Sequence, residues 1–356
     1  MSSIAILVPS LKKGGAEKQA ALLARALYPD HDVCMLIPFP DAGMEKENID
    51  MSTLSPDRII AFHGKHSGSV MRLYRELRTR DIDVLFCYLT WSDFWGPIAG
   101  RLAGVKTVYQ GLRNAELPAG KLMLEKIGNL FSTGAITNNY AGARAFQAKG
   151  IKRQTVIPNC YLNPMDAIVR NPGDIVTVIT VGRFVRQKDY PVAIKSVAEA
   201  MRHDNRIRYK IIGHGELEHD VRHMVEDEGI SDRTQILINP PGILGHLVRA
   251  DIYLSTSLFE GTSNSIMEAL DASLPVVATD VGDNDQLVND GETGFLVNTG
   301  DVSAITASLL KLASDRNLRN TMGEKGNRLL KEKYGFENFK SKYLELLENE
   351  RHTECD

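Results

Sequence analysis

The chain has 356 residues, 43% of them hydrophobic and 24% charged, and this length suits about two globular domains. Glycine and proline number 29 and 14, ordinary amounts that exclude collagen-like and low-complexity proteins. No apolar run approaches the roughly 18 residues of a membrane-spanning helix, and no basic segment followed by an apolar stretch opens the chain. The scattered cysteines, Cys34, Cys87, Cys160 and Cys355, favour reduced thiols and argue against a zinc site. We therefore expect a cytoplasmic protein.

Charge is distributed unevenly along the chain. The total is −3, but residues 1–170 carry a net charge of +6 and residues 171–356 carry −9. A basic first half suits an anionic partner, such as a phosphorylated acceptor or a membrane surface, and random surface variation is the alternative.

The most basic stretch extends over residues 63–80. The basic residues that could contact an anionic partner in this stretch are His63, His66, Arg72, Arg75, Arg78 and Arg80. A solvated helix face is one interpretation, and contact with a lipid-diphosphate or an anionic membrane is the other. Nucleic acid is not an expected partner, because Tyr74 is the only stacking aromatic residue in the stretch and the overall charge is negative.

Strand-like and helix-like segments alternate along the first half of the chain, which predicts a parallel α/β unit. Short apolar runs predict strands at residues 4–9, 33–37, 83–88, 106–109, 134–137 and 155–157. Helical periodicity between them predicts helices that include residues 16–27, 69–80 and 141–149.

The periodicity stops near residues 158–174, where prolines and Gly173 indicate a linker. A second alternating series follows, with predicted strands at residues 175–181, 207–212, 235–238, 252–255, 275–278 and 295–297. We therefore place one domain at residues 1–170 and a second at residues 171–335. A last helix over about residues 336–349 has apolar positions at helical spacing, which suit packing on either domain.

A dense group of small and polar residues follows the predicted strand at residues 252–255. Gly261, Thr262 and Ser263 precede a predicted helix, so their main-chain N–H groups can approach a ligand closely. Because a helix N-terminus offers free donors and a partial positive charge, this position suits a phosphate.

Two glutamates lie at the ends of this group. Glu260 is a candidate site carboxylate, with a solvated loop carboxylate as the alternative. Glu268 is a second candidate, and a capping box with Ser265 is its alternative, since Ser-x-x-Glu fits that pattern.

Two cations, Arg183 and Lys188, follow the first strand of the second unit. Open α/β sheets bind ligands at the carboxyl ends of their strands, so these cations suit a diphosphate, with a solvated basic turn as the alternative. Gly15, in the Gly-Gly-Ala-Glu stretch at residues 14–17, permits a tight turn with the main chain near a ligand. No Gly-x-Gly-x-x-Gly fingerprint and no P-loop motif is present, which disfavours nicotinamide dinucleotides.

These motifs occur in an order that resembles glycosyltransferase family 4, retaining enzymes of the GT-B fold, over nearly the whole chain. The similarity rests on short stretches at residues 14–17, 156–159, 182–188, 212–215, 260–268, 280–282 and 290–297. The sequence departs from the pattern at Cys160, where the family usually has a glycine.

The resemblance implies the GT-B fold, in which two Rossmann-like domains with parallel sheets face an interdomain cleft. It implies that the last helix, residues 336–350, packs on the first, acceptor-side domain. It also implies that the second domain binds a nucleotide-sugar, with Arg183 and Lys188 on the diphosphate and Glu268 on the ribose.

By the same resemblance, Glu260 contacts the donor sugar. Main-chain N–H groups near Gly15 and at residues 261–263 complete the phosphate cradle. Arg183, Lys188 and Glu260 are thus the expected catalytic residues, because fixed charges stabilise the leaving diphosphate without a metal.

A second departure concerns the first domain. Many family members place a histidine after the fourth strand, and residues 108–116 contain none. We assign Arg113 and Asn114 to acceptor or donor-sugar contacts, with a structural loop as the alternative. Front-face attack, in which a phosphate oxygen of the donor takes the proton of the acceptor, requires no protein base.

The sequence thus predicts a cytoplasmic retaining glycosyltransferase, attached peripherally to the inner face of the membrane. Its donor would be a UDP-linked sugar and its acceptor a glycan or lipid-diphosphate-linked oligosaccharide of a bacterial surface polysaccharide. Neither a metal nor another cofactor is expected. A sugar-nucleotide epimerase of the same fold and a non-catalytic nucleotide- or carbohydrate-binding protein are the alternatives.

Overall fold

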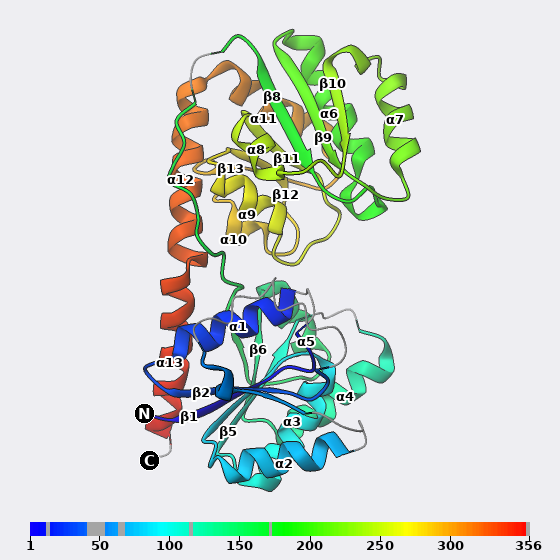
Figure 1. The fold of residues 1–356 in the computed structure, drawn as a ribbon. Helices are drawn as coiled ribbons and strands as arrows, with labels where there is room; N and C mark the ends of the chain where they lie inside the picture. The colour runs from blue at the N-terminus through cyan, green and yellow to red at the C-terminus, as the bar shows by residue number, and fades with distance from the viewer. Residues whose placement is uncertain (12–14, 41–53, 63–67, 114–116, 171–172, 354–356) are drawn as a thin grey trace. The chain divides into compact units, whose positions relative to one another are not determined.

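The computed structural model describes residues 1–11, 15–40, 54–62, 68–113, 117–170 and 173–353, with side chains described as far as Asn349. The chain folds into two compact units, one of Met1–Cys160 with Phe336–Asp356 and one of Tyr161–Gly335 (Figure 1). None of the helices in the described ranges combines the length and the apolar composition that are needed to cross a bilayer.

The first unit is built on a seven-stranded parallel sheet in the order β3-β2-β1-β4-β5-β6-β7. Its strands are β1 (Ser3–Leu7), β2 (Asp32–Ile37), β3 (Ile59–Ala61), β4 (Val84–Cys87), β5 (Thr107–Leu112), β6 (Gly134–Thr137) and β7 (Gln154–Val156). The central strand β1 places Ile4 between Val33 of β2 and Val84 of β4. The strand order reverses between β1 and β4, so the loops after these strands diverge and leave room for a ligand.

Helices cover both faces of this sheet, which explains why its strands are almost continuously apolar. They are α1 (Gly15–Leu27), α2 (Ser69–Thr79), α3 (Thr90–Ala103), α4 (Ala119–Phe131), α5 (Tyr140–Ala148) and α13 (Phe336–Thr353), with a 3-10 turn at Pro56–Arg58. Figure 1 shows α1 on the face opposite to α2, α3 and α4, and α1 also contacts α13.

The last helix, α13, lies in the first unit. Its buried residues Phe339, Tyr343 and Leu347 repeat at helical spacing, and the ring of Tyr343 packs edge-on against Phe86 of β4. This apolar stripe fastens the C-terminal helix to the sheet of the first unit.

The second unit is built on a six-stranded parallel sheet in the order β10-β9-β8-β11-β12-β13. Its strands are β8 (Val176–Val181), β9 (Ile207–Gly213), β10 (Thr234–Ile238), β11 (Ile252–Ser255), β12 (Val276–Thr279) and β13 (Gly294–Val297). Here the strand order reverses between β8 and β11.

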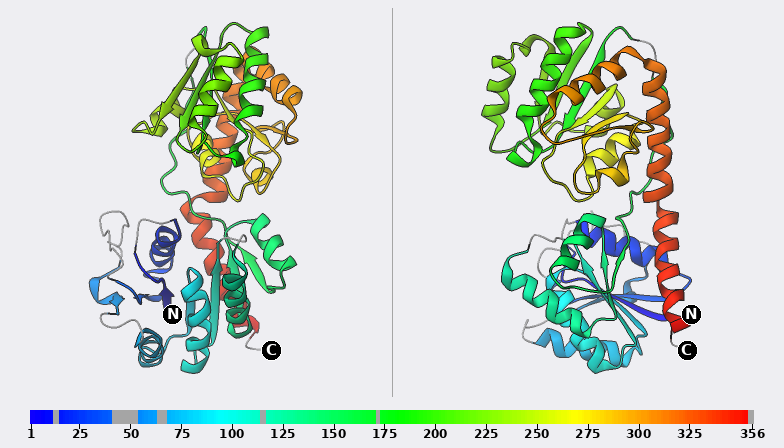
Figure 2. Two further views of the ribbon diagram at one scale, coloured as in Figure 1. Left: turned by 90° about the vertical axis from the view of Figure 1, so that its right-hand side faces the viewer. Right: turned by 180° about the vertical axis from the view of Figure 1, so that it is seen from behind.

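Two layers of helices enclose this second sheet, as the further views in Figure 2 show. They are α6 (Tyr190–His203), α7 (Glu218–Asp227), α8 (Ile243–Val248), α9 (Asn264–Asp271), α10 (Asn284–Leu287), α11 (Val302–Ser314) and α12 (Arg316–Tyr334). Because α6 packs on α11 and α9 packs on α12, the unit contains two apolar clusters.

Residues 161–170, which the sequence analysis assigns to the first domain, belong to the second unit, so the break follows Cys160. The hydroxyl of Tyr161 donates a hydrogen bond to Asp271 at 3.0 Å, and the guanidinium of Arg170 donates to three main-chain carbonyls. Prolines remove the helical and strand periodicity here, but these side chains still bind the segment to the end of α9.

Candidate active site

Two sequence-predicted residues, Lys188 and Glu260, meet where the strand order of the second sheet reverses. Lys188 follows β8 within the 3-10 turn Arg186–Lys188, and Glu260 follows β11. Because β8 and β11 are parallel neighbours, both loops leave the same edge of the sheet. This edge is where open α/β sheets bind ligands.

Lys188 and Glu260 form an ion pair through the ammonium of Lys188 and Oε1 of Glu260. The hydroxyl of Ser257 donates a second hydrogen bond to the same oxygen at 2.7 Å. The two side chains are only 17% and 9% exposed, so solvent screens the pair much less than it screens a surface salt bridge. Removing one partner would leave the charge of the other without its counter-ion in a poorly solvated place, which is unfavourable.

Hydrogen bonds fasten the loop that contains Lys188 to the loop that contains Glu260. The amide of Leu258 donates to the carbonyl of Gln187 at 2.8 Å, and Nε2 of Gln187 donates to the carbonyl of Phe259 at 2.7 Å. The hydroxyl of Thr256 donates to the carbonyl of Lys188 at 2.9 Å. These bonds hold both charged groups in place before any ligand arrives, which electrostatic catalysis requires.

Two glycines allow the loops at this edge to approach one another. Gly282 has φ +64°, and a Cβ atom there would overlap the carbonyl oxygen of Glu260. At Gly213 a Cβ atom would overlap the carbonyl oxygen of Gly182. Only glycine fits such contacts between main chains.

Glu268 lies in α9 and is partly buried. The helix begins at Asn264, after Ser263, so Ser265 lies inside it and the alternative of a Ser265–Glu268 capping box is wrong. Burial raises the pKa of Glu268, and the nearby Asp271 raises this pKa further. Among the described residues the carboxyl group has no hydrogen bond or ion pair, so its oxygens can accept from a ligand.

The remaining donor-binding candidates lie in three places. Arg183 is exposed, and its guanidinium has no partner within the described part of the chain. Gly261, Thr262 and Ser263 directly precede α9, as the sequence predicts. Gly15 is the first residue of α1 in the first unit.

Arg113, the candidate sugar-contact residue of the first unit, follows β5. Its Nη1 donates to Oδ1 of Asn159 at 2.7 Å, and its guanidinium lies over the ring of Tyr88, 4.8 Å from the centroid. Its Nε is buried and has no hydrogen-bond partner among the described residues. Asn114, the other candidate, lies outside the described residues.

Sequence reasoning missed the residues that position the ion pair, namely Ser257, Gln187 and Thr256. The position of Ser257, three residues before Glu260, was an available signal, because a hydroxyl at that spacing reaches a loop carboxylate. Gln187 and Thr256 act through contacts between two separate loops, which a single sequence does not reveal.

Side chains within the basic stretch at residues 63–80 bind neighbours within the same unit. Arg72 lies over the ring of Phe62, 5.2 Å from its centroid, and Arg78 donates to the hydroxyl of Tyr74 at 2.8 Å. Arg80 pairs with Glu76 at 3.1 Å. His63 and His66 lie outside the described residues. These contacts favour a solvated helix face for the described part of the stretch.

The second unit matches a known family model. Residues 165–329 match the model described as Glycosyl transferases group 1. The lipopolysaccharide core biosynthesis glycosyltransferase LpsE of Rhizobium meliloti is 27% identical over 176 residues, 49% of this chain and 51% of the relative. The chain thus spans about half the length of that relative.

A second relative extends over more of the chain. It is the UDP-Gal:alpha-D-GlcNAc-diphosphoundecaprenol alpha-1,3-galactosyltransferase of Escherichia coli, 23% identical over 282 residues, 71% of this chain and 72% of the relative.

The crystal structure of Anabaena HepE in complex with UDP and glucose has a similar fold. It covers 98% of this chain and 100% of its own, with a TM-score of 0.74 and 18% identity. This similarity, with the two parallel sheets, confirms the predicted GT-B fold class of two Rossmann-like domains. The chain therefore has the fold of GT-B glycosyltransferases, and its residues 165–329 match the group 1 family of glycosyl transferases.

Proposed function

We propose that this protein is a retaining glycosyltransferase of family 4 that works in the synthesis of a bacterial surface polysaccharide. It transfers a sugar from a UDP-linked donor to a glycan or a lipid-diphosphate-linked acceptor. The observation that carries the proposal is the desolvated Lys188–Glu260 pair at the reversal of strand order, within the residues that match the group 1 family.

The names of similar proteins support the donor and acceptor classes. LpsE is named for lipopolysaccharide core biosynthesis. The Escherichia coli relative is named for UDP-Gal and a diphosphoundecaprenol acceptor, and HepE was crystallised with UDP and glucose. We extend these properties to this chain as part of the proposal.

In the proposed reaction, the bond between the anomeric carbon and the diphosphate oxygen breaks, and its electron pair stays on the oxygen. Negative charge therefore grows on the nucleoside diphosphate, while the sugar becomes oxocarbenium-like. Arg183, Lys188 and the N–H groups at residues 261–263 stabilise the growing anion, and Glu260 faces the positive sugar carbon. These groups, and no metal ion or other cofactor, neutralise the leaving group in this proposal.

The acceptor hydroxyl attacks the anomeric carbon from the face that the diphosphate leaves. A phosphate oxygen of the donor takes the hydroxyl proton, and the new glycosidic bond keeps the original configuration. Glu268 binds the ribose hydroxyls, and the N–H groups near Gly15 complete the phosphate cradle. Arg113 and Asn114 contact the acceptor or the donor sugar.

Calorimetric binding of UDP, GDP, ADP and NAD tests the proposal. We expect UDP to bind most tightly, and we expect Glu268→Ala to weaken UDP binding by about tenfold or more, because hydrogen bonds to a charged group are lost. Glu292→Ala, which removes an exposed carboxylate of the same unit, is the control and should bind UDP like the wild type. Selective NAD binding, or unchanged UDP binding by Glu268→Ala, would contradict the proposal.

Products distinguish the proposed transferase from its alternatives. Mass analysis after incubation with the nucleotide-sugar alone should show no rearranged sugar, whereas an epimerase would produce one. A binding protein would bind UDP without turnover under any acceptor. The anomeric configuration of the transferred sugar, measured by NMR, tests retention.

We also propose that the enzyme contacts the inner face of the membrane through α4. Met123, Leu130 and Phe131 of this helix are 61%, 78% and 42% exposed, and Lys121 and Lys126 are exposed beside them. Apolar side chains flanked by lysines suit the surface of an anionic bilayer. This surface on α4 replaces the stretch at residues 63–80 as the proposed membrane contact.

Sedimentation with phosphatidylglycerol vesicles measures this contact. Leu130→Glu is expected to lower the partition coefficient of the protein between vesicles and solution by about tenfold, since burying a leucine side chain contributes roughly 1.5–3 kcal/mol. Leu244→Glu, at an exposed leucine of α8 in the second unit, is the matched control. Equal binding by the two variants would rule out α4 as the membrane contact.

A further inference from the structure

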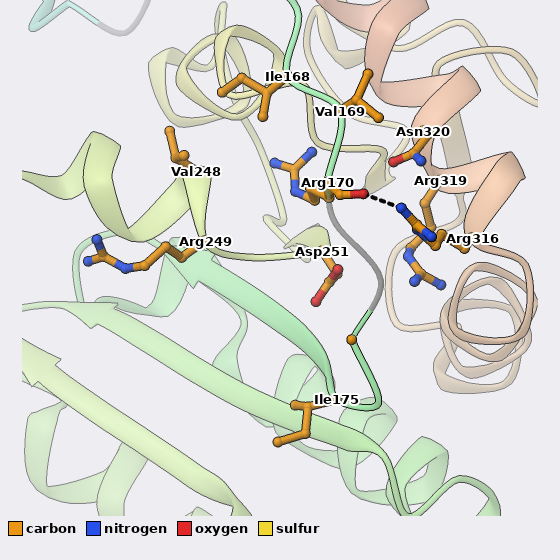
Figure 3. Close-up of a pocket in the computed structure, with 11 residues that line it drawn as sticks. Ile168, Val169, Arg170, Ile175, Val248, Arg249, Asp251, Arg316, Arg319 and Asn320 are labelled. Carbon is orange, nitrogen blue, oxygen red and sulfur yellow. Dashed lines mark hydrogen bonds between the residues drawn. The ribbon is translucent and has the colours of Figure 1, made fainter.

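A cavity of about 490 Å³ opens in the second unit, at the edge of the sheet opposite to Lys188 and Glu260 (Figure 3). Its walls include Ile175 and Asp251, which directly precede β8 and β11, and residues of the first turns of α12. In a parallel sheet all strands begin at one edge and end at the other. The cavity is therefore separate from the candidate active site.

The charged groups around this cavity are mostly cationic. Arg170, Arg249, Arg316 and Arg319 line it, and Asp251 is the single carboxylate among its lining residues. One oxygen of Asp251 already accepts the amide of Thr177 at 2.8 Å. Burial lowers the pKa of Arg170 to about 10, and the positive charge of Arg319 also lowers it, while Asp251 raises it. An anion in the cavity would relieve this excess of positive charge.

Two of these arginines are occupied by the fold itself. Arg170 donates to the carbonyls of Ala250, Ala272 and Ser273, at 2.5, 2.6 and 2.6 Å. Arg319 donates through Nη1 to two carbonyls at the end of α11, at 2.6 and 3.1 Å. Their main role is structural, although their charges still act on the cavity.

Arg316 is different, because part of its guanidinium has no partner. Its Nη2 donates to the carbonyl of Arg170 at 2.5 Å, as the dashed line in Figure 3 marks. Its Nε and Nη1 donate to no described residue. Nε is closed to solvent, whereas Nη1 retains accessible surface, so Nη1 is the donor that a bound anion can reach. Figure 3 also shows that the guanidinium of Arg249 points away from the other three.

The cavity also has an apolar side. Val169 and Ile175 line it and are 73% and 53% exposed, and Ile168 and Val248 continue the apolar wall. Val169 and Ile175 share this cavity with the guanidinium of Arg316, which has donors without partners among the described residues. This combination suits a ligand with one anionic end and one apolar end. The volume lies in the range of roughly 300–1,000 Å³ that is typical of small-molecule sites.

We infer that this cavity binds a small organic phosphate with an apolar substituent. The phosphate accepts hydrogen bonds from Arg316, because a guanidinium matches the geometry of phosphate oxygens. The apolar substituent packs on Val169 and Ile175. This site is independent of the proposed donor site at the other edge of the sheet.

Calorimetry on the whole protein with butyl phosphate, inorganic phosphate and butanol tests the inference. Butyl phosphate should bind one to one and about tenfold or more tightly than inorganic phosphate, because each buried CH₂ strengthens binding. Butanol should give no heat of binding. Saturating UDP should leave the affinity for butyl phosphate unchanged, since the two ligands occupy separate sites.

Three variants locate the site. Arg316→Gln should weaken butyl phosphate binding by about tenfold or more through loss of a charge-assisted bond. Asn320→Asp adds a negative charge to the wall without removing any hydrogen bond shown by the structure, so it should weaken binding even if Arg316→Gln folds poorly. Lys325→Gln, at an exposed lysine of α12 that does not line the cavity, is the control and should bind like the wild type. No butyl phosphate binding, displacement by UDP, or equal affinity of Asn320→Asp and Lys325→Gln would overturn the inference.

Discussion

Replacing Lys188 by alanine is expected to lower the rate of the proposed reaction, measured as UDP release from the nucleotide-sugar, by about 100- to 1,000-fold. The side chain of this lysine is only 17% exposed and pairs with Glu260, and hydrogen bonds hold its loop in place. In the proposed reaction, its removal takes away stabilisation of the leaving diphosphate, and it leaves Glu260 desolvated without its cation. The second effect removes the partner that holds the Glu260 carboxylate in place, so this carboxylate no longer faces the positive sugar carbon as the proposed reaction requires.

A matched variant separates this role from a general effect of positive charge. Arg186→Ala removes a cation two residues earlier, where the side chain is exposed and has no partner among the described residues. Steady-state kinetics should give a kcat for Arg186→Ala within about twofold of the wild type. Equal losses in the two variants would show that Lys188 has no specific role.

A double variant tests whether Lys188 and Glu260 work as a unit. If each residue acts through the other, Lys188→Ala combined with Glu260→Gln should lose little more activity than Lys188→Ala alone. Multiplicative losses would mean that the two side chains act independently. UDP affinity, measured on the same proteins, distinguishes weaker binding from slower chemistry.

The sequence predicted most of the fold because strands and helices of a parallel α/β protein have distinct local patterns. Twelve strands lie within about three residues of their predicted bounds, since each is a short apolar run between turn residues. The prediction omitted β3, Ile59–Ala61, which has only three residues at the edge of its sheet, all half-buried. So short a strand shows no alternation, and only its pairing with β2 defines it.

The candidate site was predictable in its residue types but not in its internal contacts. Motif order identified Lys188 and Glu260, yet their ion pair depends on β8 and β11 being neighbours in space. The local Ser-x-x-Glu pattern pointed to a capping box with Ser265 as the N-cap, whereas the N-cap is Ser263, two residues earlier, and the helix begins at Asn264. Helix starts depend on tertiary packing as well as on sequence, so a local signal alone misplaced this one.

The first unit buries two carboxyl groups whose ionisation should lower its stability at neutral and alkaline pH. Asp93 of α3 and Glu125 of α4 are only 1% and 3% exposed. Asp93 accepts the amide of Gly111 at 2.8 Å, whereas Oε2 of Glu125 has no partner among the described residues. Burial raises the pKa of both carboxyls, and the charge of Asp93 raises the pKa of Glu125 further.

The direction of the pH effect follows from these raised pKa values. Between the ordinary carboxyl pKa of about 4 and the raised values, the folded state binds more protons than the unfolded state. The free energy of unfolding therefore falls as pH rises through this range. Above the raised pKa values the whole destabilising contribution is present.

We therefore expect Glu125→Gln to stabilise the first unit at pH 8 by roughly 1–3 kcal/mol, and much less at pH 5. Glutamine keeps the size of the side chain and cannot ionise, so its folding carries no cost of burying a charge. Urea unfolding followed by tryptophan fluorescence measures this effect selectively. Both tryptophans of the chain, Trp91 and Trp95, lie on α3 beside Asp93 and so report the first unit.

Glu337→Gln provides the control, because Glu337 is an exposed residue of α13 in the same unit. Its free energy of unfolding should differ from that of the wild type by the same small amount at both pH values. If Glu125→Gln shows this behaviour too, or is less stable than the wild type at pH 8, Glu125 bears no desolvation cost. The stabilisation that we expect at pH 8 would instead show that a buried carboxyl group of this unit opposes its folding.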